Sequence, residues 1–112
     1  MERFAHNLDD AEGPDNDGTV SSGEIDPQGP LALRSGLPVD AIVAALREEE
    51  IPAGVSRDAG GYVCNHVFYS LLALLERERP QARGGFVHVP PLEAVPLERL
   101  VGAAGIMLQL VR

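Results

Sequence analysis

Apolar residues recur at helical spacing in three stretches of the chain. From residue 37 they return every three or four positions as far as the acidic triplet at 48–50, which predicts a helix ended by Pro52. A second helix is predicted from about residue 61 to residue 78, and its apolar residues cover so wide an arc that most of it should be buried. A third helix is predicted from Pro96 onward, with one apolar face made of Leu97, Leu100, Val101, Ala104, Leu108 and Val111.

Strand patterns lie before and between these helices. Residues 3–8 alternate apolar and polar side chains, which favours a short strand, and residues 53–56 form a second candidate. Residues 85–90 indicate a buried strand that ends at Pro90 and Pro91. Strands that alternate with helices predict one α/β domain over residues 1–112, in which helices flank a layered sheet.

The first strand and the first helix are separated by an acidic, turn-rich tract, residues 9–36. It contains five glycines and three prolines, and it holds seven acidic residues against one arginine. We therefore expect an acidic Gly/Pro-rich loop within the domain. A loop of this length in a compact domain is either functional or loosely held.

The charge balance restricts the partners that this chain can have. Its formal net charge is −8 at pH 7, and such a surface repels duplex nucleic acid and anionic membranes, so neither is expected as a partner. No stretch approaches the roughly 18 apolar residues that span a bilayer, and the first residues lack a signal-peptide pattern. A single cysteine suits a reducing compartment, so we expect a cytoplasmic protein.

Cys64 is the first candidate for chemistry, because it should fall in the first turn of the second helix. The unsatisfied backbone N–H groups and the helix dipole at that position favour a thiolate. Gly60 and Gly61 just before it would let a substrate carbonyl approach the backbone, where free N–H groups could hold an oxyanion. The alternative is a buried cysteine that only fills space.

Two histidines are candidate partners for this thiol. His66 is two residues from Cys64, which on a helix separates the side chains by roughly 200°, so we expect His66 to be a hydrogen-bonded structural residue. His88 lies within the strand predicted at 85–90, where an imidazole must find a polar partner. A cysteine–histidine pair is the working unit of thiol hydrolases, although a satisfied core histidine is the alternative for His88. We expect His6 to be structural.

Three segments together resemble the pyroglutamyl peptidases. Residues 55–69 read VSRDAGGYVCNHVFY and resemble the nucleophile segment of that family, Ser-x-x-Ala-Gly-x-x-x-Cys-Asn. Residues 84–90, GGFVHVP, resemble the segment that carries the family's catalytic histidine, at the usual interval from the cysteine. Residues 2–7, ERFAHN, are similar to the Glu-Arg-x-Ala-x-Asn segment whose glutamate completes the triad.

The resemblance implies a cysteine peptidase that removes amino-terminal pyroglutamate from peptides through a thioester, without metal or cofactor. It implies that Cys64 is the nucleophile, that His88 is its base, and that Glu2 orients the base. It further implies peptides with amino-terminal pyroglutamate as partners, and a possible homo-oligomer. The alternative is a truncated, catalytically inactive remnant of the family, or an interaction module.

Two departures from the family pattern affect the expected activity. Family members are about twice as long, so we expect this chain to correspond to the carboxy-terminal half of a larger α/β/α domain. The aromatic-lined loop implied in holding the pyroglutamyl ring belongs to the other half. Near the Pro-Asp-Asn motif the family usually has an arginine, where this chain has Glu12-Gly13. We therefore expect little peptidase activity from these 112 residues alone.

Overall fold

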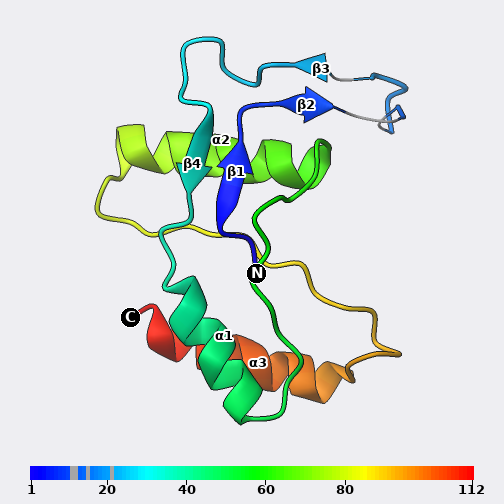
Figure 1. Ribbon diagram of the computed structural model, residues 1–112, viewed down its shortest axis with the longest axis vertical. Helices are drawn as coiled ribbons and strands as arrows, with labels where there is room; N and C mark the ends of the chain where they lie inside the picture. Colours follow the sequence, from blue (N-terminus) through cyan, green and yellow to red (C-terminus); the bar gives the residue numbers. More distant parts are fainter. Residues whose placement is uncertain (11–12, 15, 21) are drawn as a thin grey trace.

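The computed structural model describes residues 1–10, 13–14, 16–20 and 22–112. Its elements occur in the order β1 (Phe4–His6), β2 (Asp9–Asp10), β3 (Ser22–Gly23), β4 (Ala32–Arg34), α1 (Val39–Glu48), α2 (Val63–Glu78) and α3 (Leu97–Leu110). In Figure 1, α2 lies behind the β1–β4 pair, and α1 and α3 lie together below them. The mixture of strands and helices confirms the predicted α/β class.

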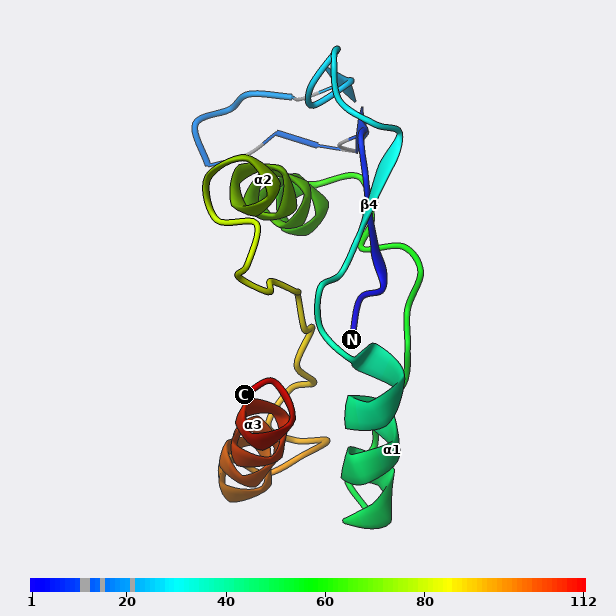
Figure 2. The same ribbon diagram turned by 90° about the vertical axis from the view of Figure 1, so that its left-hand side faces the viewer.

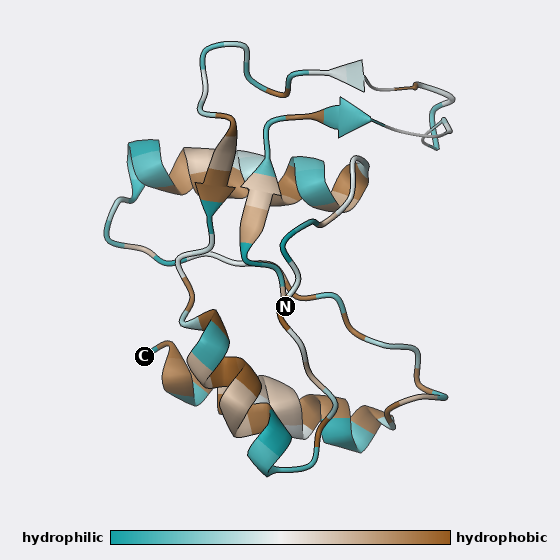
Figure 3. Ribbon diagram, in the orientation of Figure 1, coloured by the Kyte–Doolittle hydropathy of each residue, from teal (hydrophilic) through white to brown (hydrophobic). Residues whose placement is uncertain are grey.

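The upper layer is built from two antiparallel strands and one helix. β1 pairs with β4 in the register Phe4↔Arg34, Ala5↔Leu33 and His6↔Ala32. α2 covers one face of this pair (Figure 2), and the cluster between them is made of Ala5, Phe68, Tyr69 and Leu72. Figure 3 shows the same layering, since β1, β4 and the part of α2 behind them are hydrophobic whereas β2 is hydrophilic.

The lower part of the domain is a pair of helices with its own core. α1 and α3 stand side by side (Figure 2) and bury Ile42, Leu46, Ile51 and Ala103 between them. The guanidinium of Arg3, next to β1, pairs with the carboxylate of Asp40 in the first turn of α1. This ion pair joins the lower helices to the upper layer.

Glu2 lies between two extended segments. It forms a parallel bridge with Ser56 and an antiparallel bridge with Phe86. The strands predicted at 53–56 and 85–90 were therefore too long, because among the described residues each segment forms a bridge at one position only. Ser56 pairs with one edge of the amino-terminal segment as far as Arg3. From Arg3 onward β4 pairs with that same edge, because Ser35 N–H donates to the Arg3 carbonyl.

The tract 9–36 was predicted as a loop, and this is wrong in part. It contains β2 and β3, which pair with each other, and β4, which pairs with β1. The buried side chain of Asn7 also fixes the tract, because its Nδ2 donates to the Asp26 carbonyl at 2.7 Å and its Oδ1 accepts from Asp26 N–H at 2.8 Å.

The predicted apolar faces of two helices also differ from the structure. α2 buries only one face, and Val63 and Val67 are each 51% exposed. α3 packs on α1 through Ala103, Ile106 and Met107, so the predicted face with Leu97, Val101 and Leu108 is exposed. Periodicity predicted the helices, but it does not determine how much of an apolar surface finds a partner. None of the helices in the described residues has the length and apolar character of a membrane span.

Candidate active site

Glu2 and His88 form the centre of the site. His88 Nδ1 lies 2.9 Å from Glu2 Oε1, and Glu2 is only 4% exposed. Because a carboxylate can only accept, the Nδ1 position carries the hydrogen, and Nε2 has no hydrogen-bond partner among the described residues. The side chain of His88 is 48% exposed, so Nε2 has access to a substrate.

The backbone holds Glu2 rigidly in this position. Its N–H donates to the Phe86 carbonyl at 2.9 Å on one edge. On the other edge, Ser56 N–H donates to the Met1 carbonyl at 2.8 Å and Arg3 N–H donates to the Ser56 carbonyl at 2.7 Å. The second carboxylate oxygen, Oε2, is buried and has no hydrogen-bond partner among the described residues. Burying a carboxylate oxygen without a hydrogen-bond partner costs free energy. The backbone hydrogen bonds on both edges of Glu2 therefore have to hold the side chain in this position.

Aromatic contacts connect α2 to the segment that carries Phe86 and His88. The ring centroids of Phe68 and Phe86 are 5.9 Å apart, and those of Phe86 and His88 are 5.0 Å apart. Cys64 precedes Phe68 by four residues and thus lies on the same side of α2. This face of the helix is therefore turned toward the segment that carries His88.

Cys64 lies in the first turn of α2, as predicted. Tyr62, at the N-cap, makes no side-chain cap, and the first turn contains no acidic residue. In the described residues no side chain caps the backbone N–H groups at this helix start, and such groups can hold an anionic group. Cys64 is half-buried, and among the described residues its sulfur makes no hydrogen bond to His88. The structure thus brings Glu2 and His88 into direct contact, and in the part of the chain that it describes the thiol is not hydrogen-bonded to His88.

The loop before α2 is shaped by two glycines for different reasons. Gly60 has φ +88°, a conformation that favours glycine, and open space surrounds the position of a Cβ there. At Gly61 a Cβ would lie 2.8 Å from the Cβ and 2.9 Å from the carbonyl oxygen of Asp10. Only Gly60 therefore leaves the open approach expected for a substrate carbonyl. The space beside Gly61 is filled by β2.

The other two histidines have structural partners. His66 Nδ1 lies 3.0 Å from both carboxylate oxygens of Asp9 and ties the start of α2 to β2. His6 Nε2 lies 2.9 Å from the Arg57 carbonyl. The hydrogen-bonded structural role predicted for His66 is confirmed, and the backbone partner of His6 agrees with the structural role expected of it. No group of three or more His, Cys, Asp or Glu side chains in the described residues could hold a metal ion.

Asn65 is the residue that the sequence analysis passed over. It is completely buried next to Cys64, and its amide makes three hydrogen bonds to the backbone of His6 and Leu8. The available signal was a polar residue inside the apolar arc of a predicted helix, because a buried amide must be hydrogen-bonded. Glu12, where the family has an arginine, lies outside the described residues.

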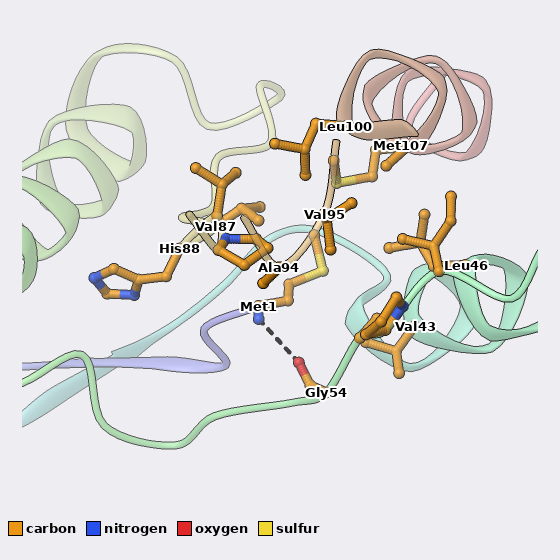
Figure 4. A pocket seen from close by; sticks show the side chains of 16 residues that line it. Met1, Val43, Leu46, Gly54, Val87, His88, Ala94, Val95, Leu100 and Met107 are labelled. Carbon is orange, nitrogen blue, oxygen red and sulfur yellow. Dashed lines mark hydrogen bonds between the residues drawn. The ribbon is translucent and has the colours of Figure 1, made fainter. Parts of the chain in front are cut away.

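An apolar cavity of about 420 Å³ lies between α1, α3 and the segments 51–54 and 87–90. Figure 4 shows that the imidazole of His88, at its rim, points away from the apolar side chains of Val95 and Leu46. The Met1 amino group donates to the Gly54 carbonyl at 2.9 Å beside it. The cavity is thus a neighbour of the site, and the free nitrogen of His88 is directed elsewhere.

Two electrostatic effects lie outside the His88 site. The hydrogen bond from Arg3 lowers the pKa of the Asp40 carboxyl below its ordinary value. Burial raises the pKa of the Tyr69 phenol, and the negative charges of nearby acidic residues, namely Asp26, Glu76 and Glu24, raise it further. The phenol donates to the Pro30 carbonyl at 2.7 Å.

Known structures share this fold. Pyroglutamyl peptidase I from Bacillus amyloliquefaciens superimposes with a TM-score of 0.90 at 38% identity, over 98% of this chain and 57% of that chain. Pyrrolidone carboxyl peptidase from Thermococcus litoralis gives a TM-score of 0.92 at 33% identity, over 98% and 57% of the two chains. The fold is therefore that of an α/β peptidase of this type.

Sequence comparison gives the family. The family model for pyroglutamyl peptidase matches residues 1–110. A pyrrolidone-carboxylate peptidase of Bacillus amyloliquefaciens is 46% identical over 99 residues, which are 88% of this chain and 46% of the relative. One from Streptomyces coelicolor is 53% identical over 91 residues, which are 80% of this chain and 42% of the relative. The chain belongs to the pyroglutamyl peptidase family, and it spans about half the length of the curated relatives it matches.

Proposed function

We propose that this chain supplies the catalytic groups of a cysteine peptidase that removes amino-terminal pyroglutamate from peptides. The observation that carries the proposal is the 2.9 Å hydrogen bond between the buried carboxylate of Glu2 and Nδ1 of His88. In a thiol hydrolase this arrangement fixes the imidazole so that Nε2 can accept a proton. Cys64, Glu2 and His88 also match the family's nucleophile, acid and base in its motif order.

In the first step, the sulfur of Cys64 attacks the carbonyl carbon of the pyroglutamyl residue. His88 Nε2 takes the thiol proton as the S–C bond forms, and Glu2 stabilises the resulting imidazolium. The uncapped N–H groups at the start of α2 support the negative charge on the carbonyl oxygen. The C–N bond then breaks, and His88 gives the proton to the leaving amine.

In the second step, water resolves the thioester. His88 removes a proton from the water as its oxygen attacks the acyl carbon, and the proton returns to the sulfur as the S–C bond breaks. The products are free pyroglutamate and the regenerated thiol. The absence of a hydrogen bond between sulfur and imidazole in the described residues agrees with a resting enzyme, because catalytic hydrogen bonds often tighten only with substrate bound.

The test is release of a fluorogenic amine from its pyroglutamyl conjugate. The 112-residue chain is assayed alone and fused to the amino-terminal half of a relative, because catalysis also needs the substrate ring to be held in place. We expect the fusion to turn over the substrate and the Cys64→Ser fusion to be inactive. A folded fusion that is inactive, also after Glu12→Arg, would contradict the proposal.

An aldehyde analogue of pyroglutamate separates an enzyme from an inactive family member or an interaction module. A catalytic thiol adds to the aldehyde carbon and forms a hemithioacetal, in which the thiol proton ends on the aldehyde oxygen; native mass spectrometry detects this adduct, and Cys64→Ser is the control. We expect the adduct on Cys64 in the fusion. A fusion that binds other proteins but never forms the adduct would favour the interaction module.

Location and assembly complete the proposal. A thiol nucleophile must stay reduced, which supports a cytoplasmic location. The exposed apolar residues of α3, namely Leu97, Val101 and Leu108, support association with another copy. Cell fractionation tests the location, and light scattering of the purified chain with and without Val101→Glu tests the association.

A further inference from the structure

The side chain of Asn65 binds the backbone as another strand would. Its Oδ1 accepts from His6 N–H at 2.9 Å, and its Nδ2 donates to the His6 carbonyl at 2.8 Å and to the Leu8 carbonyl at 3.1 Å. Asn65 is 0% exposed, so its own amide cannot turn to water and must find its hydrogen bonds within the protein. One buried amide therefore joins the first turn of α2 to β1.

The hydrogen bonds of residues 2–8 show which edge Asn65 occupies. Alternate residues of an extended chain point their N–H and C=O groups to the same edge. Glu2 and His6 are both even-numbered, and Glu2 N–H donates to the Phe86 carbonyl whereas His6 N–H donates to Asn65. The segment of His88 and the start of α2 thus adjoin one edge, and β4 occupies the other.

This arrangement makes one rigid connection between all three proposed catalytic groups. Glu2 begins the segment and holds His88, and Asn65 fastens the helix turn of Cys64 to the same segment four residues further on. We propose that Asn65 is a positioning residue that holds the Cys64 thiol in register with the Glu2–His88 pair. The inference rests on the proposed function, because it assigns to Asn65 a role in that site.

The test measures how the alkylation rate of Cys64 by iodoacetamide depends on pH. The readout is the rate at pH 6.5 divided by the rate at pH 9.5, because the ratio cancels changes in access to the sulfur. Only the thiolate reacts, so loss of the aligned imidazole should lower this ratio in Asn65→Ala by about tenfold. Asn65→Ser keeps one polar atom for His6 N–H and should give an intermediate ratio.

Tyr69→Phe is the matched control, because it also removes a buried hydrogen bond from α2, more than one helical turn away from Cys64. It should lower the thermal midpoint and leave the ratio within about twofold of the wild type, since the thiolate fraction is unchanged. A folded Asn65→Ala or Asn65→Ser chain with the wild-type ratio would overturn the inference. Failure of both variants to fold would assign Asn65 to folding alone and would overturn it too.

His88→Ala distinguishes this inference from the proposed function. If the wild-type ratio equals that of a free cysteine, or does not change in His88→Ala, the proposed function fails and the inference fails with it. If His88→Ala lowers the ratio and Asn65→Ala does not, only the positioning role is contradicted.

Discussion

The carboxylate of Glu2 accepts a hydrogen bond from Nδ1 of His88 at 2.9 Å, although 86 residues separate them in the sequence. The contact arises because Glu2 pairs through its backbone with Phe86, two residues before His88. Residues two apart on an extended segment share a face, so the side chain of His88 lies on the same side as that of Phe86, the residue that the bridge places opposite Glu2. The backbone bridge is thus the physical cause of the side-chain pair.

The first prediction concerns the charge of Glu2. Glu2→Gln should fold with a thermal midpoint at pH 8 equal to or above the wild type, because a neutral amide costs less to bury than a carboxylate. Turnover of the fluorogenic substrate by the fusion should fall on the order of 10⁴-fold, as when a triad acid becomes an amide. Wild-type turnover in a folded Glu2→Gln protein would show that Glu2 does not orient His88.

The second prediction concerns alkaline stability. The raised pKa of Tyr69 means that the unfolded chain loses this proton near pH 10 while the folded chain keeps it, so the stabilisation is complete below about pH 10 and declines above it. Urea unfolding of Tyr69→Phe should show a loss of about 1 kcal/mol at pH 7 from the hydrogen bond to Pro30. Between pH 10 and 11.5 its stability should fall less steeply than that of the wild type. If the stabilities of the wild type and Tyr69→Phe fell equally steeply over this pH range, the raised pKa of Tyr69 would be contradicted.

The third prediction concerns acid stability. Because Arg3 lowers the pKa of Asp40 in the folded state, the stabilisation from this pair is present above the ordinary carboxyl value, about 3.9, and disappears as the pH falls through the lowered value. The difference in thermal midpoint between wild type and Asp40→Asn should be small at pH 7 and vanish near pH 2. Glu78→Gln, from an exposed pair with Arg77, is the control and should change nothing at either pH.

The fourth prediction compares two glycines. Gly61→Ala should destabilise the chain by about 1–3 kcal/mol, because its Cβ would press on the backbone of Asp10, which cannot move freely. Gly102→Ala, within α3 and in open space, should stabilise it by about 0.5–1 kcal/mol through helix propensity. Denaturant midpoints measure both. Equal effects at the two sites would contradict the packing of β2 against the loop before α2.

The sequence predicted the parts of the structure that depend on local pattern. The three helices were found close to their bounds. Pro38 and Pro52 flank α1, Pro96 precedes α3, and Cys64 was correctly placed in the first turn of α2. β4 was missed because it has only three residues and lies among glycines and prolines, which is too short for an alternation of apolar and polar side chains to show. Its pairing with β1 is a long-range contact.

The candidate site was predictable through motifs and not through spacing. Glu2 and His88 were proposed from the family resemblance, and their contact is now seen. Asn65 stood out in the sequence only as a polar residue within an apolar helix face. Its partners are backbone groups of His6 and Leu8, 57 or more residues away, and such partners leave no mark in a sequence pattern. The exposure of Val63 and Val67 was also missed, because an apolar stripe does not specify whether anything covers it.

The central claim is that Cys64 and His88 act as one catalytic unit. The most direct measurement is the pH profile of Cys64 alkylation in the wild type, His88→Ala and the control His66→Ala. We predict that the wild-type thiol reacts readily below pH 7, that His88→Ala needs a higher pH than the wild type, and that His66→Ala matches the wild type. A wild-type profile equal to that of free cysteine, or one that His66→Ala changes and His88→Ala does not, would contradict the account.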